Sequence, residues 1–158
     1  MSLNESDHQR WLTEMLATNR ISKVQPNTAR GNDLLVQARQ HVASARVLAT
    51  ADPTLALAAC HDAVRKAIDA EAGANGHRFE NAPGAHAITI EYARTQLDGV
   101  LSVEDASLAD RLRERRHGAE YGRLSVHAVG PVEIEAFAQM ADRVVRAVIA
   151  RRTADPDG

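Results

Sequence analysis

Cysteine and aromatic residues are scarce in this sequence of 158 residues, which has one Cys and only 3% Phe, Trp and Tyr. The single Cys60 excludes an intramolecular disulfide framework and a cysteine-rich zinc or iron–sulfur site. No apolar run approaches the roughly 20 residues that a membrane-spanning helix needs, and the acidic N-terminus does not resemble a signal peptide. We therefore expect a cytoplasmic protein that does not contact a membrane.

A surplus of either charge is also missing, because 19 lysines and arginines are balanced by 21 aspartates and glutamates. This balance gives no general attraction to phosphate, so any contact with nucleic acid must come from a local patch. The sequence contains no phosphate-binding or dinucleotide-binding glycine loop and no Gly-x-Ser-x-Gly elbow. These absences leave a conventional small-molecule enzyme unsupported, and we expect no cofactor.

Alanine is the commonest residue, and it supplies much of the apolar content. A thin core of Ala, Leu and Val favours closely packed helices over sheets, which prefer β-branched and aromatic residues. Apolar residues recur at helical spacing in five segments, whereas no strand-like alternation is long enough to matter. Two predicted helices span about 28–49 and from 53 to Gly73 or Gly76. A third helix follows the loop 81–84, carries Ile90, Ala93 and Leu97 and closes near Gly99, and two more span about 103–121 and 131–152. We predict an all-α fold, with the first two helices packed antiparallel because their connection is very short.

A short amphipathic segment around Trp11 precedes these helices. The only tryptophan of the chain lies there, and a Trp on a marginal helix is usually buried against something. The sequence Gln25-Pro26-Asn27 then breaks the pattern. We therefore divide the chain into an N-terminal helix and linker at 1–26, a helical bundle at 27–152 and a disordered tail at 153–158.

The densest polar cluster lies on the fourth predicted helix, from Asp110 to Tyr121. The residues that share one face of this helix, at 100° per residue, are Arg113, Arg116, His117 and Glu120. Guanidinium groups beside an imidazole can hold an RNA phosphate, stabilise developing negative charge and move a proton near neutral pH. On the pattern alone, a solvated, salt-bridged helix face remains the alternative.

Arg115 differs from its neighbours because it falls in the apolar stripe of the same helix. Its charge must reach solvent, pair with an acid or face a partner chain. Alanine-rich helices also offer small side chains for close packing between subunits. We therefore expect a homodimer in which Arg115 meets a carboxylate of the partner.

A second polar cluster follows Cys60 on the second predicted helix. Asp62 can reach Arg65 and Lys66 along the helix, and Arg65 can reach Asp69, so an ordinary salt-bridged face is the default interpretation. Cys60 itself lies on the buried stripe, which favours a small packed side chain over a reactive thiol.

Metal binding is the natural rival function for a helical bundle. Glu114 and His117 have the i, i+3 spacing of a di-iron ligand pair. Such a site needs a second pair and two more inward carboxylates, which the sequence lacks, so we expect no metal.

Three segments, taken in order, make the chain resemble the HEPN superfamily, and in particular small HEPN-domain proteins of actinobacterial type. They are the alanine-rich segment 58–68 with His61, Asp62, Arg65 and Lys66, the loop Gly84-Ala85-His86, and the arginine-rich segment 111–121. The resemblance covers about residues 27–150. It implies an antiparallel up-and-down four-helix bundle plus additional helices, dimerised through the arginine-rich helix.

The resemblance also implies where catalysis would reside. Catalytic HEPN proteins are metal-independent endoribonucleases with an Arg, a polar residue, three variable residues and a His. Arg116 occupies the Arg position and His117 the polar position, whereas Tyr121 stands where the catalytic His would be. Since the unperturbed pKa of Tyr is about 10, Tyr121 would transfer protons poorly at neutral pH. A looser alignment pairs Arg111 with His117.

These patterns lead to one main hypothesis and two alternatives. The first is a HEPN-like dimer that binds RNA or a partner with little or no catalysis, within a toxin–antitoxin or defence module that includes a nucleotidyltransferase or antitoxin. The alternatives are an active metal-independent endoribonuclease toxin and a structural or di-iron bundle. The candidate catalytic residues are Arg116, His117 and Tyr121. The candidate RNA- or partner-binding residues are Arg111, Arg113, Arg115, Glu120, Asp62 and Arg65.

Overall fold

The protein is mostly helical, as its composition predicts. The computed structural model describes residues 4–120, 122 and 129–154. Within these residues the elements are α1 (Glu5–Ala17), β1 (Ile21–Lys23), α2 (Thr28–Leu48), α3 (Pro53–Ala74), β2 (His77–Phe79), α4 (Ala85–Gln96), α5 (Val103–Glu120) and α6 (Pro131–Ala154). None of the described helices is both long and apolar enough to cross a membrane.

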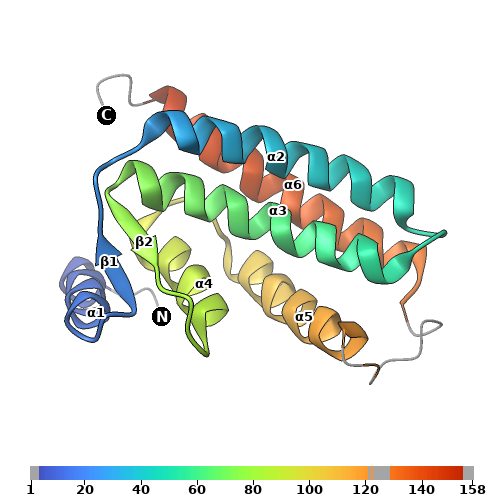
Figure 1. The fold of residues 1–158 in the computed structure, drawn as a ribbon, viewed down its shortest axis with the longest axis horizontal. Coiled ribbons are helices and arrows are strands. Elements are labelled where there is room, and N and C mark those ends of the chain that lie inside the picture. Colours follow the sequence, from blue (N-terminus) through green and yellow to red (C-terminus); the bar gives the residue numbers. More distant parts are fainter. Residues whose placement is uncertain (1–3, 121, 123–128, 155–158) are drawn as a thin grey trace.

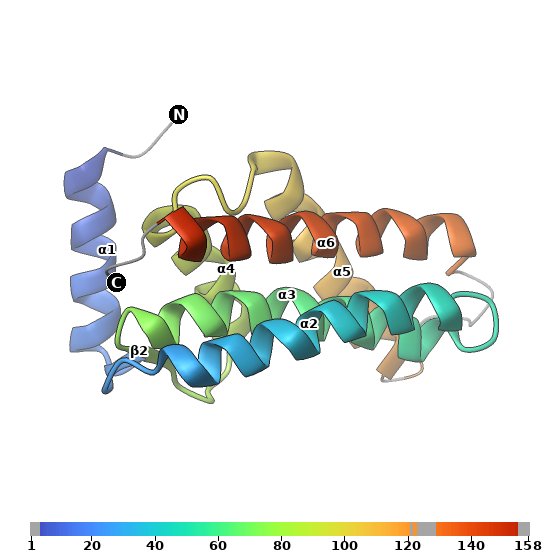
Figure 2. The same cartoon turned by 90° about the horizontal axis from the view of Figure 1, so that it is seen from above.

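The helices α2 and α3 lie side by side, and α6 packs against both of them (Figures 1 and 2). Asn27 begins α2 by accepting a hydrogen bond from the backbone N–H of Arg30, and Asp52 begins α3 in the same way from Leu55. Pro53 occupies the first position of α3, where a missing N–H removes no helical bond. These local signals confirm the boundaries predicted for the start of both helices.

Alanine lets these three helices approach closely. The alanines with no exposed surface include Ala38 and Ala45 of α2, Ala56, Ala63, Ala67 and Ala70 of α3, and Ala138 and Ala141 of α6. Larger side chains such as Ile68, Phe137 and Val144 fill the space between them. Cys60 is fully buried in this core, and burial raises the pKa of its thiol to about 12. The prediction that Cys60 is a packed core residue is confirmed.

The helix α5 packs against α3 and α6 and presents the arginine-rich segment. Leu112 anchors it in the core. Arg115 pairs with an acid, because its Nε and Nη2 lie 2.6 and 2.7 Å from the two carboxylate oxygens of Glu133 on α6. The carboxylate that pairs with Arg115 in this structure therefore comes from the same chain, and the expected contact with a partner's carboxylate remains a prediction.

The strands β1 and β2 were not predicted. They form a short antiparallel pair in which Ile21 lies opposite Phe79. Three residues are too few to show a sequence alternation, so only tertiary pairing reveals them. The pair joins α1 to the remaining helices, and Trp11 of α1 lies with its ring centroid 6.5 Å from that of the buried Tyr92. The expected helix around Trp11 and its packing are thus confirmed.

One predicted boundary agrees with the structure and one differs from it. α4 begins at Ala85, directly after the loop predicted at 81–84, because Gly84 adopts a left-handed conformation (φ 82°) and turns the loop directly into the helix. α6 continues to Ala154, so the first two residues of the predicted tail are helical. The remaining tail, 155–158, and Tyr121 lie outside the described residues.

Candidate functional site

The three segments that carry the family resemblance meet around two histidines. His61 lies in the middle of α3, and His86 lies in the first turn of α4. Their imidazoles approach within 2.9 Å, from Nε2 of His61 to Nδ1 of His86. The ring centroids are 4.7 Å apart and the ring planes are inclined by 25°. Arg113 and Arg116 of α5 lie close enough to act on the charge of His86.

The loop before α4 is held in place by contacts from another part of the chain. Arg20, which precedes β1, donates a hydrogen bond of 2.8 Å from Nη2 to the carbonyl of Pro83. Gly84 then adopts a left-handed backbone conformation, and the turn that results places His86 against α3. The position of His86 therefore depends on contacts that the local sequence does not contain.

His86 is electrically neutral at physiological pH. Burial is the main cause that lowers the pKa of His86 to about 3, and the charges of His61, Arg113 and Arg116 contribute to the same shift. The same burial leaves its Nε2 atom without a hydrogen-bond partner among the described residues. An unsatisfied buried polar atom costs about 1–3 kcal/mol, and such atoms in native proteins often mark functional sites.

Asp62 completes the arrangement on the other side of His61. Its Oδ1 atom lies 3.8 Å from Nδ1 of His61. The His61 imidazole is the main cause that lowers the pKa of the Asp62 carboxyl, with burial opposing it and Arg65 and Arg116 adding to it. The carboxylate favours a proton on Nδ1 of His61, so Nε2 accepts from Nδ1–H of His86. In this tautomer Nε2 of His86 carries no proton, and the low pKa of the ring keeps it unprotonated at neutral pH.

The predicted residues of α5 occupy different environments. Arg116 is half-buried and lines a cavity of about 370 Å³ together with Asp52, Thr54, Leu55 and Ala58 at the start of α3. Arg111, Arg113 and His117 are exposed. Tyr121 and the side chain of Glu120 lie outside what the structure describes. Among these residues, Arg116 and Arg113 are the ones whose charges act on the histidine pair.

The two ion pairs predicted for Arg65 on α3 are present, whereas the one predicted for Lys66 is not. Arg65 lies 3.7 Å from Asp62 and 3.1 Å from Asp69. Lys66, which the helical spacing also placed within reach of Asp62, instead donates a hydrogen bond of 2.7 Å to Gln37 and lies 2.9 Å from Nε2 of His41, both on α2.

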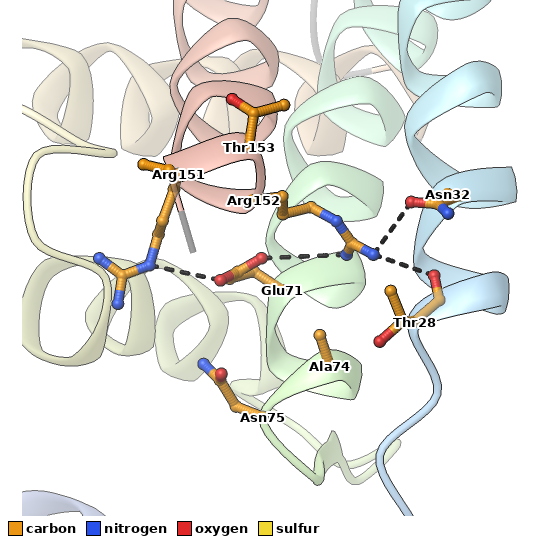
Figure 3. Close-up of a pocket in the computed structure, with 9 residues that line it drawn as sticks. Thr28, Asn32, Glu71, Ala74, Asn75, Arg151, Arg152 and Thr153 are labelled. Carbon is orange, nitrogen blue, oxygen red and sulfur yellow. Dashed lines mark hydrogen bonds and ion pairs between the residues drawn. The ribbon is translucent and has the colours of Figure 1, made fainter. Parts of the chain in front are cut away.

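A larger cavity, of about 590 Å³, lies between the ends of α3 and α6 and the start of α2 (Figure 3). The buried carboxylate of Glu71 sits there between Arg151 and Arg152. Arg152 donates hydrogen bonds to the carbonyls of Ala70 and Thr28 and to the side chain of Asn32. These bonds join three helices, which explains the cluster as a structural tie.

The two histidines were quoted in the sequence motifs but were not among the predicted site residues. The sequence did hold a signal for this pair, because the segments 58–68 and 84–86 each contain one histidine. Both segments belong to the resemblance, as does the arginine-rich segment on α5. In the part of the chain that the structure describes, no group of three His, Cys, Asp or Glu side chains could hold a metal. Comparison of the chain with models of known protein families, with curated proteins and with solved structures finds no match.

Proposed function

We propose that this chain is a HEPN-like, RNA-binding protein that holds a phosphodiester at the site formed by His61, His86, Arg113 and Arg116. The observation that carries the proposal is the contact between His61 and His86 beside the arginines of α5. Each of the three resembling segments contributes to it, although they are far apart in the sequence. A resemblance by chance would give no reason for them to meet.

The chemistry of these groups suits a phosphodiester better than a metal or an apolar ligand. Guanidinium groups of Arg113 and Arg116 offer several donors to phosphate oxygens, and this contact is independent of base sequence. Nε2 of His86 is buried and lacks a partner among the described residues, so in this arrangement it supports the site from within and does not touch a bound strand. The preference for RNA over DNA rests on the resemblance to the HEPN superfamily.

A binding assay tests this proposal. Fluorescence polarisation of a labelled single-stranded RNA should report salt-dependent binding, and Arg113→Gln with Arg116→Gln should weaken it about 10-fold or more. Arg94→Gln is the matched control, because Arg94 is an exposed arginine of α4 paired with Glu91. Equal affinity of the double variant and the control would contradict the proposal, as would equal affinity for DNA of the same sequence.

The second candidate function is a metal-independent endoribonuclease, which the exposed His117 beside Arg116 on α5 favours. In that reaction the imidazole of His117 takes the proton of the RNA 2′-hydroxyl, and the 2′-oxygen attacks the adjacent phosphorus. The bond from phosphorus to the 5′-oxygen breaks, and the leaving oxygen takes a proton from solvent. The products are a 2′,3′-cyclic phosphate and a 5′-hydroxyl, and Arg116 stabilises the negative charge that develops on the phosphate oxygens.

Cleavage assays in the presence of a chelator separate the two candidates. If the protein is a nuclease, His117→Gln should reduce the rate by about 10²–10⁴-fold, because His117 is the exposed proton carrier of the Arg111–His117 alignment. His86→Gln serves as the comparison, since the low pKa of His86 makes it a weak base. Binding without cleavage supports the first candidate, and loss of cleavage only in the His86 variant would contradict the role given to His117.

The proposal also includes the assembly expected from the resemblance. We propose an antiparallel up-and-down bundle of HEPN type that forms a homodimer through α5. A cytoplasmic toxin–antitoxin or defence module is the proposed context, with a nucleotidyltransferase or antitoxin as the protein partner. Val103 at the start of α5 is an exposed apolar side chain that such an interface could cover.

A further inference from the structure

A second polar hollow lies toward the C-terminal end of α3, and the proposed function does not use it. It has a volume of about 420 Å³ and lies between the segment before α2, the last turns of α3, and β2. Its charged lining residues are Arg30 of α2, Arg65 and Asp69 of α3, and Arg78 of β2. Cations from three elements therefore face one space.

The lining of this hollow carries more arginines than carboxylates. Arg65 lies 3.1 Å from Asp69 and 3.7 Å from Asp62, and Arg78 lies 3.1 Å from Glu80. Arg30 is exposed, and its charge acts on Asp69 together with that of Arg65. Guanidinium groups suit the geometry of a phosphodiester.

An aromatic ring borders the same hollow. Phe79 of β2 is half-buried, and its ring stands nearly perpendicular to the buried Tyr92, at 85° with centroids 5.2 Å apart. This contact holds the ring in a fixed orientation. Proteins that bind single-stranded RNA place bases against such rings, beside a basic groove that follows the backbone.

The hollow and the two-histidine site lie on one face of α3. Asp62, Arg65 and Asp69 follow the i, i+3 and i+4 spacing of a helical row. Arg65 contacts both acids, so it belongs to both regions. At 1.5 Å per residue, the distance along the axis from Asp62 to Asp69 is about 10 Å. A short stretch of extended RNA can span that distance.

We propose that this hollow is a nucleotide subsite for the RNA strand bound at the two-histidine site. Arg30 and Arg65 hold a phosphodiester there, and Phe79 stacks against the base. This inference rests on the proposed function, because it assigns the direction in which the strand leaves that site. It adds a binding region formed by the segment before α2 and by β2, neither of which belongs to the motifs on α3, α4 and α5.

The test compares labelled oligouridylates of two and eight nucleotides by fluorescence polarisation at two salt concentrations. Arg30→Gln should weaken binding of the octamer about 3- to 10-fold and reduce the slope of log affinity against log salt by about 0.7. Phe79→Leu should weaken it by roughly 5-fold or more. Binding of the dinucleotide, which covers only the two-histidine site, should not change. Arg94→Gln again serves as the control.

A variant that fails to fold must not be read as a loss of binding. Phe79 packs against Tyr92, so thermal unfolding of each variant is measured, and Arg78→Gln provides a second variant at an exposed position. If the octamer binds and Arg30→Gln and Arg78→Gln bind it as tightly as the control, the subsite is wrong while the proposed function stands.

The opposite failure is also distinguishable. If the wild-type protein binds neither oligouridylate, the proposed function is wrong, and a titration with uridine 5′-monophosphate then judges the hollow alone. If the nucleotide shifts the amide resonances of Val24, Gly73 and Phe79 in the wild type but not in Arg30→Gln, the hollow binds a nucleotide. If these resonances do not shift in the wild type, the proposed subsite is wrong.

Discussion

His61 and His86 share a contact of 2.9 Å between Nε2 and Nδ1, although they lie on different helices and 25 positions apart in the chain. The contact brings a neutral, half-buried imidazole close to the arginines of α5. Neither ring would have this environment on an isolated helix. The pair therefore connects the packing of α3 and α4 with the chemistry proposed for the site.

The lowered pKa of His86 makes the stability of the protein depend on pH. The folded protein keeps His86 neutral down to about pH 3, whereas the unfolded chain takes up a proton below its ordinary pKa of 6.5. The contribution of His86 to the free energy of unfolding should therefore be at its full value above about pH 6.5 and should be lost as the pH drops from there toward 3. Urea unfolding at about pH 7.5 and about pH 5 should show a loss in the wild type that exceeds the loss in His86→Gln, by on the order of 1 kcal/mol after discounting for partial exposure. An equal loss in both proteins would contradict the assignment.

The ion pair between Arg115 and Glu133 should stabilise the contact between α5 and α6. Both side chains are about a quarter exposed, at 27% and 26%, and the contact is bidentate. A double-mutant cycle with Arg115→Ala and Glu133→Ala should give a coupling free energy of about 1 kcal/mol, at the upper end for exposed pairs. A coupling near zero would show that solvent screens the pair completely.

The Cys60 thiol should be unreactive in the folded protein. It has no exposed surface, and burial raises its pKa to about 12, so the thiolate is scarce at neutral pH. A thiol reagent should label it only after addition of denaturant, at a rate limited by unfolding. Rapid labelling under native conditions would mean that the core around α3 opens far more readily than its packing indicates.

Gly31→Ala should destabilise the protein even though Ala favours helices over Gly by about 1 kcal/mol. A Cβ atom there would lie 2.5 Å from Nη1 of Arg152 and 3.0 Å from the carbonyl oxygen of Ala70. The added methyl would displace the guanidinium that joins α6 to α2 and α3 (Figure 3). Thermal unfolding should show a lower midpoint for Gly31→Ala than for wild type. In the background of Arg152→Ala, the same substitution should cost less, and an identical cost would assign the effect to Ala70 alone.

The proposed homodimer is tested by light scattering at tens of micromolar protein. A biological interface should bury roughly 1,000 Å² or more, which is enough to hold two copies together at that concentration. The exposed Val103 at the start of α5 offers a probe, because Val103→Asp should shift the protein toward monomer if that end of α5 lies in the interface. A monomeric wild type would contradict the proposed assembly while leaving the RNA proposal to its own test.

Local sequence determined the helices and their beginnings. Asn27 and Asp52 start α2 and α3 with short polar side chains that accept backbone N–H groups, and this signal lies within four residues of each helix. The burial of Cys60 likewise followed from its place in a periodic apolar row. Such features depend on neighbours along one helix, so a single sequence is sufficient to predict them.

Tertiary structure decided the strands, the partner of Arg115 and the histidine pair. A strand of three residues has no readable alternation, and β1 and β2 exist because backbone groups far apart in the chain pair with each other. The pattern on α5 required Arg115 to find an acid or solvent, but only the packing of α6 selected Glu133 of the same chain. His61 and His86 each stood in a predicted motif, yet the lowered pKa of His86 arises from burial and from charges on other helices. Periodicity identifies which face of a helix is buried, whereas the identity of the side chain that it meets depends on how the helices pack in space.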